Sequence, residues 1–190
     1  MAKSNAIRIG VEDVHVAIGT QDPETGAVTY GAPKVFGGTA TISVTQEKGE
    51  NKIYESNVQI RNHSRVSAAN IAYESRTVDL ATEMEVLYNQ ATAEAADGAY
   101  EDGPEDLPVA VAVGWASPMS DGSYKCVWYY WATGSKGDES YETATESENS
   151  PTDRYDFAAM PRPDTNKLRR RKICKTKEER DAFFAAVIPA

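Results

Sequence analysis

The sequence LPVAVAVGWASPMSDGSYKCVWYYWAT, residues 107–133, contains two apolar stretches separated by a short polar one. In the first stretch the large side chains recur at every second position, the period of a β-strand with one crowded face: Val109, Val111, Val113 and Trp115. The Asp121-Gly122 pair favours a turn, and the second stretch, from Ser123, is apolar at nearly every position. We therefore predict a central hairpin over residues 107–133.

The second strand of this hairpin carries bulky apolar side chains on both of its faces. One face holds Tyr124, Cys126, Trp128 and Tyr130, and the other holds Val127, Tyr129 and Trp131. Such a strand has to be covered on both sides, either by other layers of the same domain or, in an oligomer, by a neighbouring subunit. The sequence is compatible with both arrangements.

Composition and length place limits on the rest of the chain. With 190 residues, of which 41% are hydrophobic, the chain is long enough for one domain with a single core. No apolar run approaches the ~18 residues of a membrane helix, and no basic and then apolar leader opens the chain, so we expect a soluble protein without an export signal. Cys126 and Cys174 are far apart in the sequence, and we interpret them as two reduced thiols.

The remaining patterns predict a mainly-β fold with two helices. We expect an N-terminal arm over residues 1–10 and one β domain over residues 11–190, with further strands at 11–18, 39–45, 66–74, 154–159 and 167–174. Apolar residues at helical spacing predict a helix over 78–91. A capping box at Thr176 and Glu179 predicts a short C-terminal helix over 176–187, with a buried stripe of Ala182, Phe183, Ala186 and Val187.

Residues 46–65 are mostly polar, with isolated apolar residues at Ile53, Tyr54, Val58 and Ile60. The apolar residues are too many for an idle surface loop and too few for a core. Long connections of this kind usually carry a function or become ordered by a partner. We predict a long inter-strand loop that reaches a neighbouring subunit, with those four residues as assembly candidates.

The charge is negative overall and unevenly placed. A net charge of −9 argues against a protein that holds nucleic acid, because such proteins use cationic patches to displace counterions. Cationic residues nevertheless crowd one predicted strand, at Arg169, Arg170, Arg171 and Lys172. This run is either a solvated strand face or a patch that meets acidic residues across an interface, and we include its four residues among the assembly candidates.

No arrangement of residues in the sequence is typical of an enzyme or of a metal site. His15 stands in the predicted first strand and His63 in a predicted turn at 61–64, and neither has a serine or cysteine motif near it. Gly37-Gly38 lacks the lysine and the helix of a phosphate loop. The acidic residues of loop 101–106 lack the alternate ligands and central glycine of a calcium loop. We expect no catalytic activity, no cofactor and no metal.

Several stretches of the chain resemble a known family of viral proteins. They are GVEDVHVAI, VTYGAPKVFGGTATISVTQE, LPVAVAVGWASPMSDGSYKCVWYYWATGS and YETATESENSPT. Together they resemble the major tail protein of long-tailed, non-contractile bacteriophages, and the resemblance covers most of the chain from Gly10 to about Phe184. Its most specific part is the valine–alanine strand, the Ser-Asp-Gly-Tyr-Lys turn and the aromatic strand that follows.

The resemblance implies a tail-tube fold, which is a β-sandwich or barrel with a flanking helix. In that family, subunits form hexameric rings that stack into a hollow tube; their inner sheets line the lumen, and the arm and long loops bridge rings. It also implies a place in the virion after assembly in the host cytoplasm, tape-measure, tail terminator and distal tail proteins as partners, and DNA that passes through the lumen without specific binding.

Two other classes of protein fit parts of the pattern. One is a ring-forming tail-completion or adaptor protein, which would make a single ring instead of a polymer. The other is a carbohydrate-binding β-sandwich, for which the aromatic residues Tyr54, Tyr100 and Tyr141 are candidates for stacking on sugars. Electron microscopy separates the three, since they predict tubes, single rings and monomers respectively.

Overall fold

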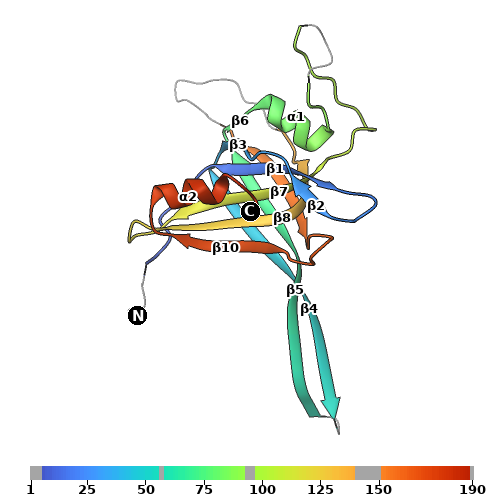
Figure 1. Ribbon diagram of the computed structural model, residues 1–190, viewed down its shortest axis with the longest axis vertical. Coiled ribbons are helices and arrows are strands. Elements are labelled where there is room, and N and C mark those ends of the chain that lie inside the picture. Colours follow the sequence, from blue (N-terminus) through green and yellow to red (C-terminus); the bar gives the residue numbers. More distant parts are fainter. Residues whose placement is uncertain (1–5, 56–57, 93–96, 140–150, 189–190) are drawn as a thin grey trace.

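The computed structural model describes residues 6–55, 58–92, 97–139 and 151–188, and for residues 50–55 and 58–64 the backbone only. The chain is mainly β, with two helices in the described ranges (Figure 1). Its elements are β1 (Val14–Gln21), β2 (Val28–Tyr30), β3 (Lys34–Gly38), β4 (Thr41–Glu55), β5 (Val58–Ser75), β6 (Thr77–Val78), α1 (Leu80–Tyr88), β7 (Ala110–Pro118), β8 (Tyr124–Lys136), β9 (Asp153–Met160), β10 (Arg169–Cys174) and α2 (Lys177–Phe184).

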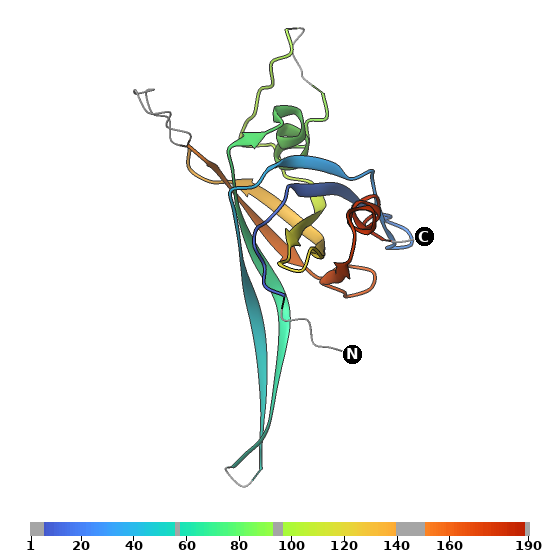
Figure 2. The ribbon, with the colours of Figure 1, turned by 90° about the vertical axis from the view of Figure 1, so that its left-hand side faces the viewer.

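The strands form one ten-stranded antiparallel sheet in the order β4-β5-β9-β8-β7-β1-β3-β6, with β2 beside β1 and β10 beside β8. Both outer parts of this path meet again, because β3 runs directly into β4 and β5 into β6. At the meeting point the hydroxyl groups of Tyr73 and Ser75 both donate to the Gly38 carbonyl, and the Ala40 amide donates to the Glu74 carbonyl at 2.9 Å. The sheet is therefore strongly curved, and its two outer parts approach each other around the concave side (Figure 2). We call this curved arrangement the curl.

Aromatic side chains fill the inside of the curl. Phe36 on β3 lies edge-on to Tyr155 and Phe157 on β9, with ring centroids 5.1 and 5.8 Å apart, and 5.9 Å from Tyr73 on β5. All four side chains are at most 1% exposed. Strands far apart in the sheet order thus contact one another across the core, and this burial stabilises the curl.

The convex side of β7, β8 and β10 is covered by α2. Trp128 is fully buried there, and its indole N–H donates to the Phe183 carbonyl at 3.2 Å. The free thiols of Cys126 and Cys174 are buried on the same side. The hairpin predicted over 107–133 is formed by β7 and β8, and the second cover that β8 requires comes from this chain itself.

Helix α1 lies across the end of the curl instead of covering a sheet face, as Figure 1 shows. Asp79 caps its first turn by accepting from the Thr82 amide at 3.0 Å. Glu83 accepts from the Tyr155 hydroxyl at 2.7 Å and pairs with Lys136 at 2.8 Å. Burial opposes the charge on Lys136, but its hydrogen bonds to Glu139 and Glu83 outweigh burial and raise its pKa. The helix is shorter than the predicted 78–91.

The C-terminal helix also differs in detail from the prediction. Thr176 caps α2 by accepting from the Glu179 amide, but Glu179 itself accepts from the Lys175 amide, one residue before the cap. The predicted stripe is partly wrong, because Ala182 and Ala186 are exposed and Phe184 is buried beside Phe183 and Val187. Phe184 is buried in place of the alanines because burial of its ring removes more apolar area from water than burial of a methyl group does.

Two predicted loose segments are ordered. Residues 46–55 and 58–65 do not form a loop but continue β4 and β5 as a paired ribbon, so the long loop over 46–65 and the turn over 61–64 are wrong. The described part of the predicted arm, residues 6–10, lies along the β7–β8 turn. There the Ile9 amide donates to Pro118 at 3.0 Å, and the Ser120 amide donates to Ile7 at 2.8 Å.

Candidate assembly surface

The β4–β5 ribbon extends well beyond the rest of the sheet (Figures 1 and 2). β5 pairs with β9 only over Ala69–Ser75, and from Val58 to Ala68 its partner is β4 alone. β4 has no second neighbour anywhere in the described sheet. The part beyond Lys48 and Val66 is about 25 Å long at about 3.3 Å per residue. This segment offers unpaired backbone groups on both of its long edges.

The four assembly candidates predicted in this segment lie near its tip. Ile53 is paired with Arg61, Tyr54 with Gln59, and Val58 with Glu55, with a register shift between Ile53 and Tyr54. The side chains of Ile53, Tyr54, Val58 and Ile60 lie outside the described part of the chain. Tyr141, a candidate for sugar stacking, also lies outside the described residues.

The outward face of β4, β5 and β9 at the base of the ribbon is built from small and polar side chains. Its exposed members include Thr41, Ser43, Thr45, Asn70 and Ala158. Four charged side chains of the described residues lie on this face. Arg154 and Asp156 share a bidentate contact at 3.0 and 3.1 Å. Glu74 accepts from the Thr41 hydroxyl and Glu47 from the Asn70 amide. This face lacks the aromatic residues that α2 covers on β8, and it is polar in consequence.

The basic strand β10 is divided between two faces of the sheet. Arg169 donates to the Tyr129 hydroxyl at 2.8 Å. It also donates to the side-chain oxygen of Gln46 at 2.8 Å when the Gln46 amide is oriented with its oxygen toward Arg169. Arg170 points the other way and lies 4.7 Å over the Phe183 ring. Arg171 and Lys172 are exposed, and no described side chain pairs with either. The predicted patch of four residues is therefore two pairs on opposite faces.

Sheet pairing brings other cations beside Arg169 and Arg171. Lys125 on β8 and Arg8 of the N-terminal segment join them around a groove of about 200 Å³ next to the base of the ribbon. Trp115 and Tyr129 form its floor and stack with ring centroids 5.7 Å apart and an interplanar angle of 14°. We call this site, lined by Arg8, Lys125, Arg169, Arg171, Trp115 and Tyr129, the basic groove.

Sequence reasoning missed half of the basic groove. Lys125 and Arg8 are isolated cations in the sequence, with no local signal. Lys125 comes to the groove because it is opposite Ile173 in the β8–β10 register. Arg8 comes because its segment bridges to Met119. Only the alternation of β10 was readable in advance.

No protein-family model matches this chain, and no curated protein matches it. Across the residues that the structure describes, no helix has both the length and the apolar character needed to cross a membrane. Within the same ranges, no three His, Cys, Asp or Glu side chains are placed together to hold a metal ion.

Proposed function

We propose that this chain is a structural protein of a long-tailed bacteriophage that polymerises as stacked hexameric rings into the tail tube, a conduit for DNA. The observation that carries the proposal is the β4–β5 ribbon, which leaves the body with no described strand on either of its outer edges. An isolated two-stranded ribbon is marginally stable in water, and an open edge is a template for another chain. Neighbouring copies would supply the missing contacts.

Closure of a ring through these edges would give the barrel that the sequence resemblance implies. The free edge of β4 would pair with a strand of the next subunit, so that the sheets of six copies become continuous around a channel. Ile53, Tyr54, Val58 and Ile60 would then lie against a neighbour, which accounts for apolar residues in an otherwise polar segment.

The polar face of β4, β5 and β9 is the surface best suited to line the channel. Its small Thr, Ser and Ala side chains leave no basic wall on which duplex DNA could displace counterions and adhere. The net charge of −9 adds a weak repulsion that is the same along the tube. Low adhesion is the activity required of a conduit, and tape-measure, tail terminator and distal tail proteins would be its partners.

The proposal is tested by negative-stain microscopy and sedimentation velocity of the purified full chain over a range of concentrations. Long hollow tubes, in equilibrium with rings, are the expected result. Single rings at every concentration would favour a tail-completion or adaptor protein. Monomers that stay monomeric at high concentration would overturn both assignments and leave the carbohydrate-binding alternative.

A further inference from the structure

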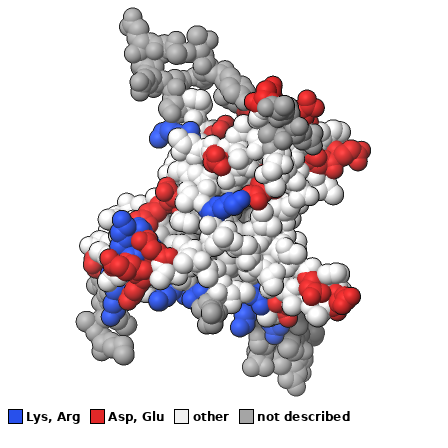
Figure 3. Space-filling view, turned by 45° about the horizontal axis from the view of Figure 1, so that its top comes forward, with Lys and Arg blue, Asp and Glu red and all other residues white. Residues whose placement is uncertain are grey.

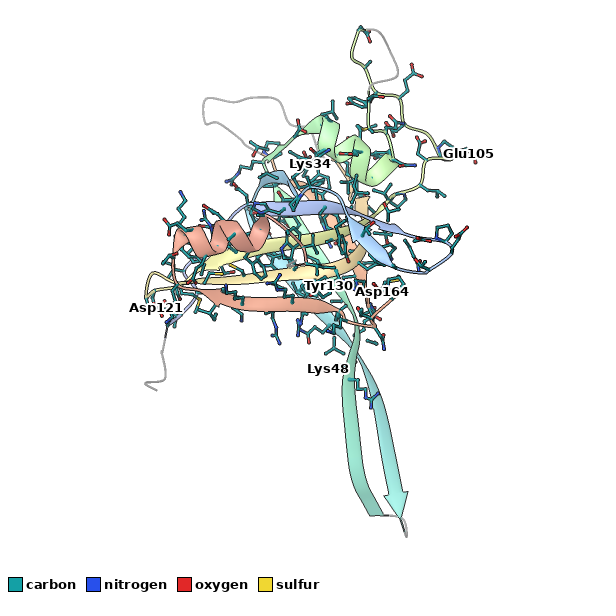
Figure 4. The ribbon with its side chains drawn as sticks, in the orientation of Figure 1. Lys34, Lys48, Glu105, Asp121, Tyr130 and Asp164 are labelled. Carbon is teal, nitrogen blue, oxygen red and sulfur yellow. The ribbon has the colours of Figure 1, made fainter. Side chains whose placement is uncertain are left out.

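An acidic segment and the basic groove lie at opposite ends of the body of the molecule, from which the ribbon extends. The segment that follows α1, residues 97–106, contains Asp97, Glu101, Asp102, Glu105 and Asp106. It lies at the end opposite β10 and the N-terminal segment, as the label at Glu105 in Figure 4 shows. The space-filling view shows carboxylates at that end, and further carboxylates elsewhere on the same face, some of them mixed with Lys and Arg side chains (Figure 3). The basic groove lies at the other end, beside the base of the ribbon.

The basic groove is built to receive a negatively charged group. Arg8, Lys125, Arg169 and Arg171 line it, and no carboxylate of the described residues does so. The side chain of Arg169 is held in place by Tyr129 and Gln46, whereas the side chains of Arg8, Lys125 and Arg171 have no hydrogen-bond or ion-pair partner in the described chain. Four cations without a counter-charge repel one another, so an anionic occupant would relieve the repulsion.

The acidic segment has free carboxylates to offer. Asp97 and Asp106 accept from backbone amides of their own loop, at 3.1 Å from Ala99 and 2.8 Å from Gly103. No described group hydrogen-bonds or ion-pairs with the side chains of Glu101, Asp102 or Glu105, and all three are exposed. The internal bonds hold the backbone in shape while three carboxylates point to solvent.

Exposed apolar side chains flank both charged sites. Leu107, 74% exposed, follows the acidic segment directly, and Ile7 and Ile9, each 66% exposed, stand on either side of Arg8. Ile173, on the groove side of β10, is 53% exposed. Specific interfaces combine an apolar centre with a charged, solvated rim, and the two ends together supply both parts.

We infer that the acidic segment 97–106 of one copy is seated in the basic groove of the next copy along the tube. This contact rests on the proposed function and names its axial partner. Because the two sites lie at opposite ends of one chain, the contact is head-to-tail, and such a contact continues as an open polymer unless it closes into a ring. A groove for nucleic acid is the competing assignment, which the net charge of −9 disfavours.

The test uses two full-length variants, K125E/R171E in the groove and D102K/E105K in the acidic segment. Each should form rings but no tubes, with a critical concentration for polymerisation at least about tenfold above wild type, since attractive ion pairs become repulsive. An equimolar mixture of the two should restore tubes in which the variants alternate. The acidic groove of K125E/R171E then faces the basic segment of D102K/E105K, and the unchanged groove and segment face each other at the next contact. The control K167E/K175E makes the same charge change on exposed cations outside the groove and should polymerise as wild type does.

Each other outcome counts against the inference. If wild type makes tubes and K125E/R171E polymerises equally well, the axial contact is wrong while the proposed function stands. If the variants are folded by circular dichroism and form rings by microscopy, but their mixture forms no tubes, the acidic segment is not the partner. If K125E/R171E instead loses affinity for a labelled DNA duplex in fluorescence anisotropy with tubes unaffected, the groove is a nucleic-acid site. If wild type forms no oligomer, the proposed function and the contact fall together.

Discussion

The hairpin β7–β8 and the hairpin β4–β5 belong to one sheet but are stabilised in different ways. β7 and β8 lie between the core inside the curl and the layer under α2, and Trp128 and Val111 are fully buried. In the outer half of β4–β5 the two strands pair with each other, and no third strand of the described residues lies beside them. Burial of apolar area supports the first hairpin, whereas the second depends on backbone pairing and, in our proposal, on other copies.

The difference separates folding from assembly within one chain. A residue in β7–β8 contributes to the free energy of unfolding of a single copy, because its contacts are complete there. A residue in the outer ribbon pairs only with the opposite strand of the ribbon in the described sheet, so it has fewer strand neighbours to lose when a single copy unfolds. Substitutions in the two hairpins should therefore have separable effects on the free energy of unfolding and on assembly.

The largest effect is expected from shortening the ribbon. Replacing residues 49–65 with a two-residue Asn-Gly turn joins Lys48 to Val66, which lie opposite each other in the register. The shortened chain should fold with a free energy of unfolding within about 0.5 kcal/mol of wild type, yet form no tubes by sedimentation or microscopy. Tubes of normal length from this variant would show that the ribbon has no part in assembly.

The next effect is the reverse case, a loss of folding stability in the body. Trp128→Ala removes a fully buried indole and its hydrogen bond to Phe183, and should cost about 3–5 kcal/mol in urea unfolding. Lys48→Ala in the ribbon, labelled in Figure 4, is the control and should change stability by less than about 0.5 kcal/mol. Equal losses at both positions would contradict the separation.

The same contrast explains what the sequence could and could not reveal. The hairpin over residues 107–133 could be predicted because strand alternation and apolar character coincide there. Residues 46–65 were wrongly predicted as a loop. A ribbon outside the core needs no alternating apolar face, so its polar sequence is typical of a loop. The pattern records burial, and it identifies strands only where strands are buried.

Only the part of the basic groove that lies on one continuous stretch of sequence could be predicted. The run Arg169 to Lys172 was found, and its alternation correctly placed Arg169 and Arg171 on one face. The other half of the basic groove was not foreseen, because Lys125 and Arg8 reach it through pairing with residues more than forty positions away. Charge arrangement across strands depends on register, which a single sequence does not specify between distant segments.

A pair of glycines offers a finer comparison of the two hairpins. A Cβ on Gly114 in β7 would lie 2.5 Å from the Trp128 ring and 2.7 Å from the Val127 carbonyl, whereas a Cβ on Gly49 in β4 would meet nothing within 4 Å. Gly114→Ala should destabilise by about 1–3 kcal/mol through overpacking. Gly49→Ala should be neutral or slightly stabilising. Thermal or urea unfolding of both variants, in parallel with wild type, measures the contrast.

The smallest effect concerns the two histidines, His15 in the body of the sheet and His63 in the outer ribbon. His15 on β1 stacks on Phe184 with ring centroids 4.5 Å apart, and its Nδ1 lies 3.2 Å from the Asp13 carbonyl. Burial lowers the pKa of His15, assisted by the charge of Arg180, and this outweighs the opposing effects of Asp13 and Glu12. The unfolded chain therefore takes up a proton at higher pH than the folded chain does.

That order of protonation fixes the direction of the pH dependence. Above pH 7 both states hold neutral His15 and it contributes nothing, and as pH falls below about 6.5 the unfolded state gains protons first, so stability declines. Urea unfolding between pH 7.5 and 5.5 should show this decline, and His15→Gln should flatten it. His63→Gln, in the part of β5 that pairs only with β4, is the matched control and should leave the slope as in wild type. A slope that follows His63 instead would mean that the ribbon, and not the body, controls the unfolding of a single copy.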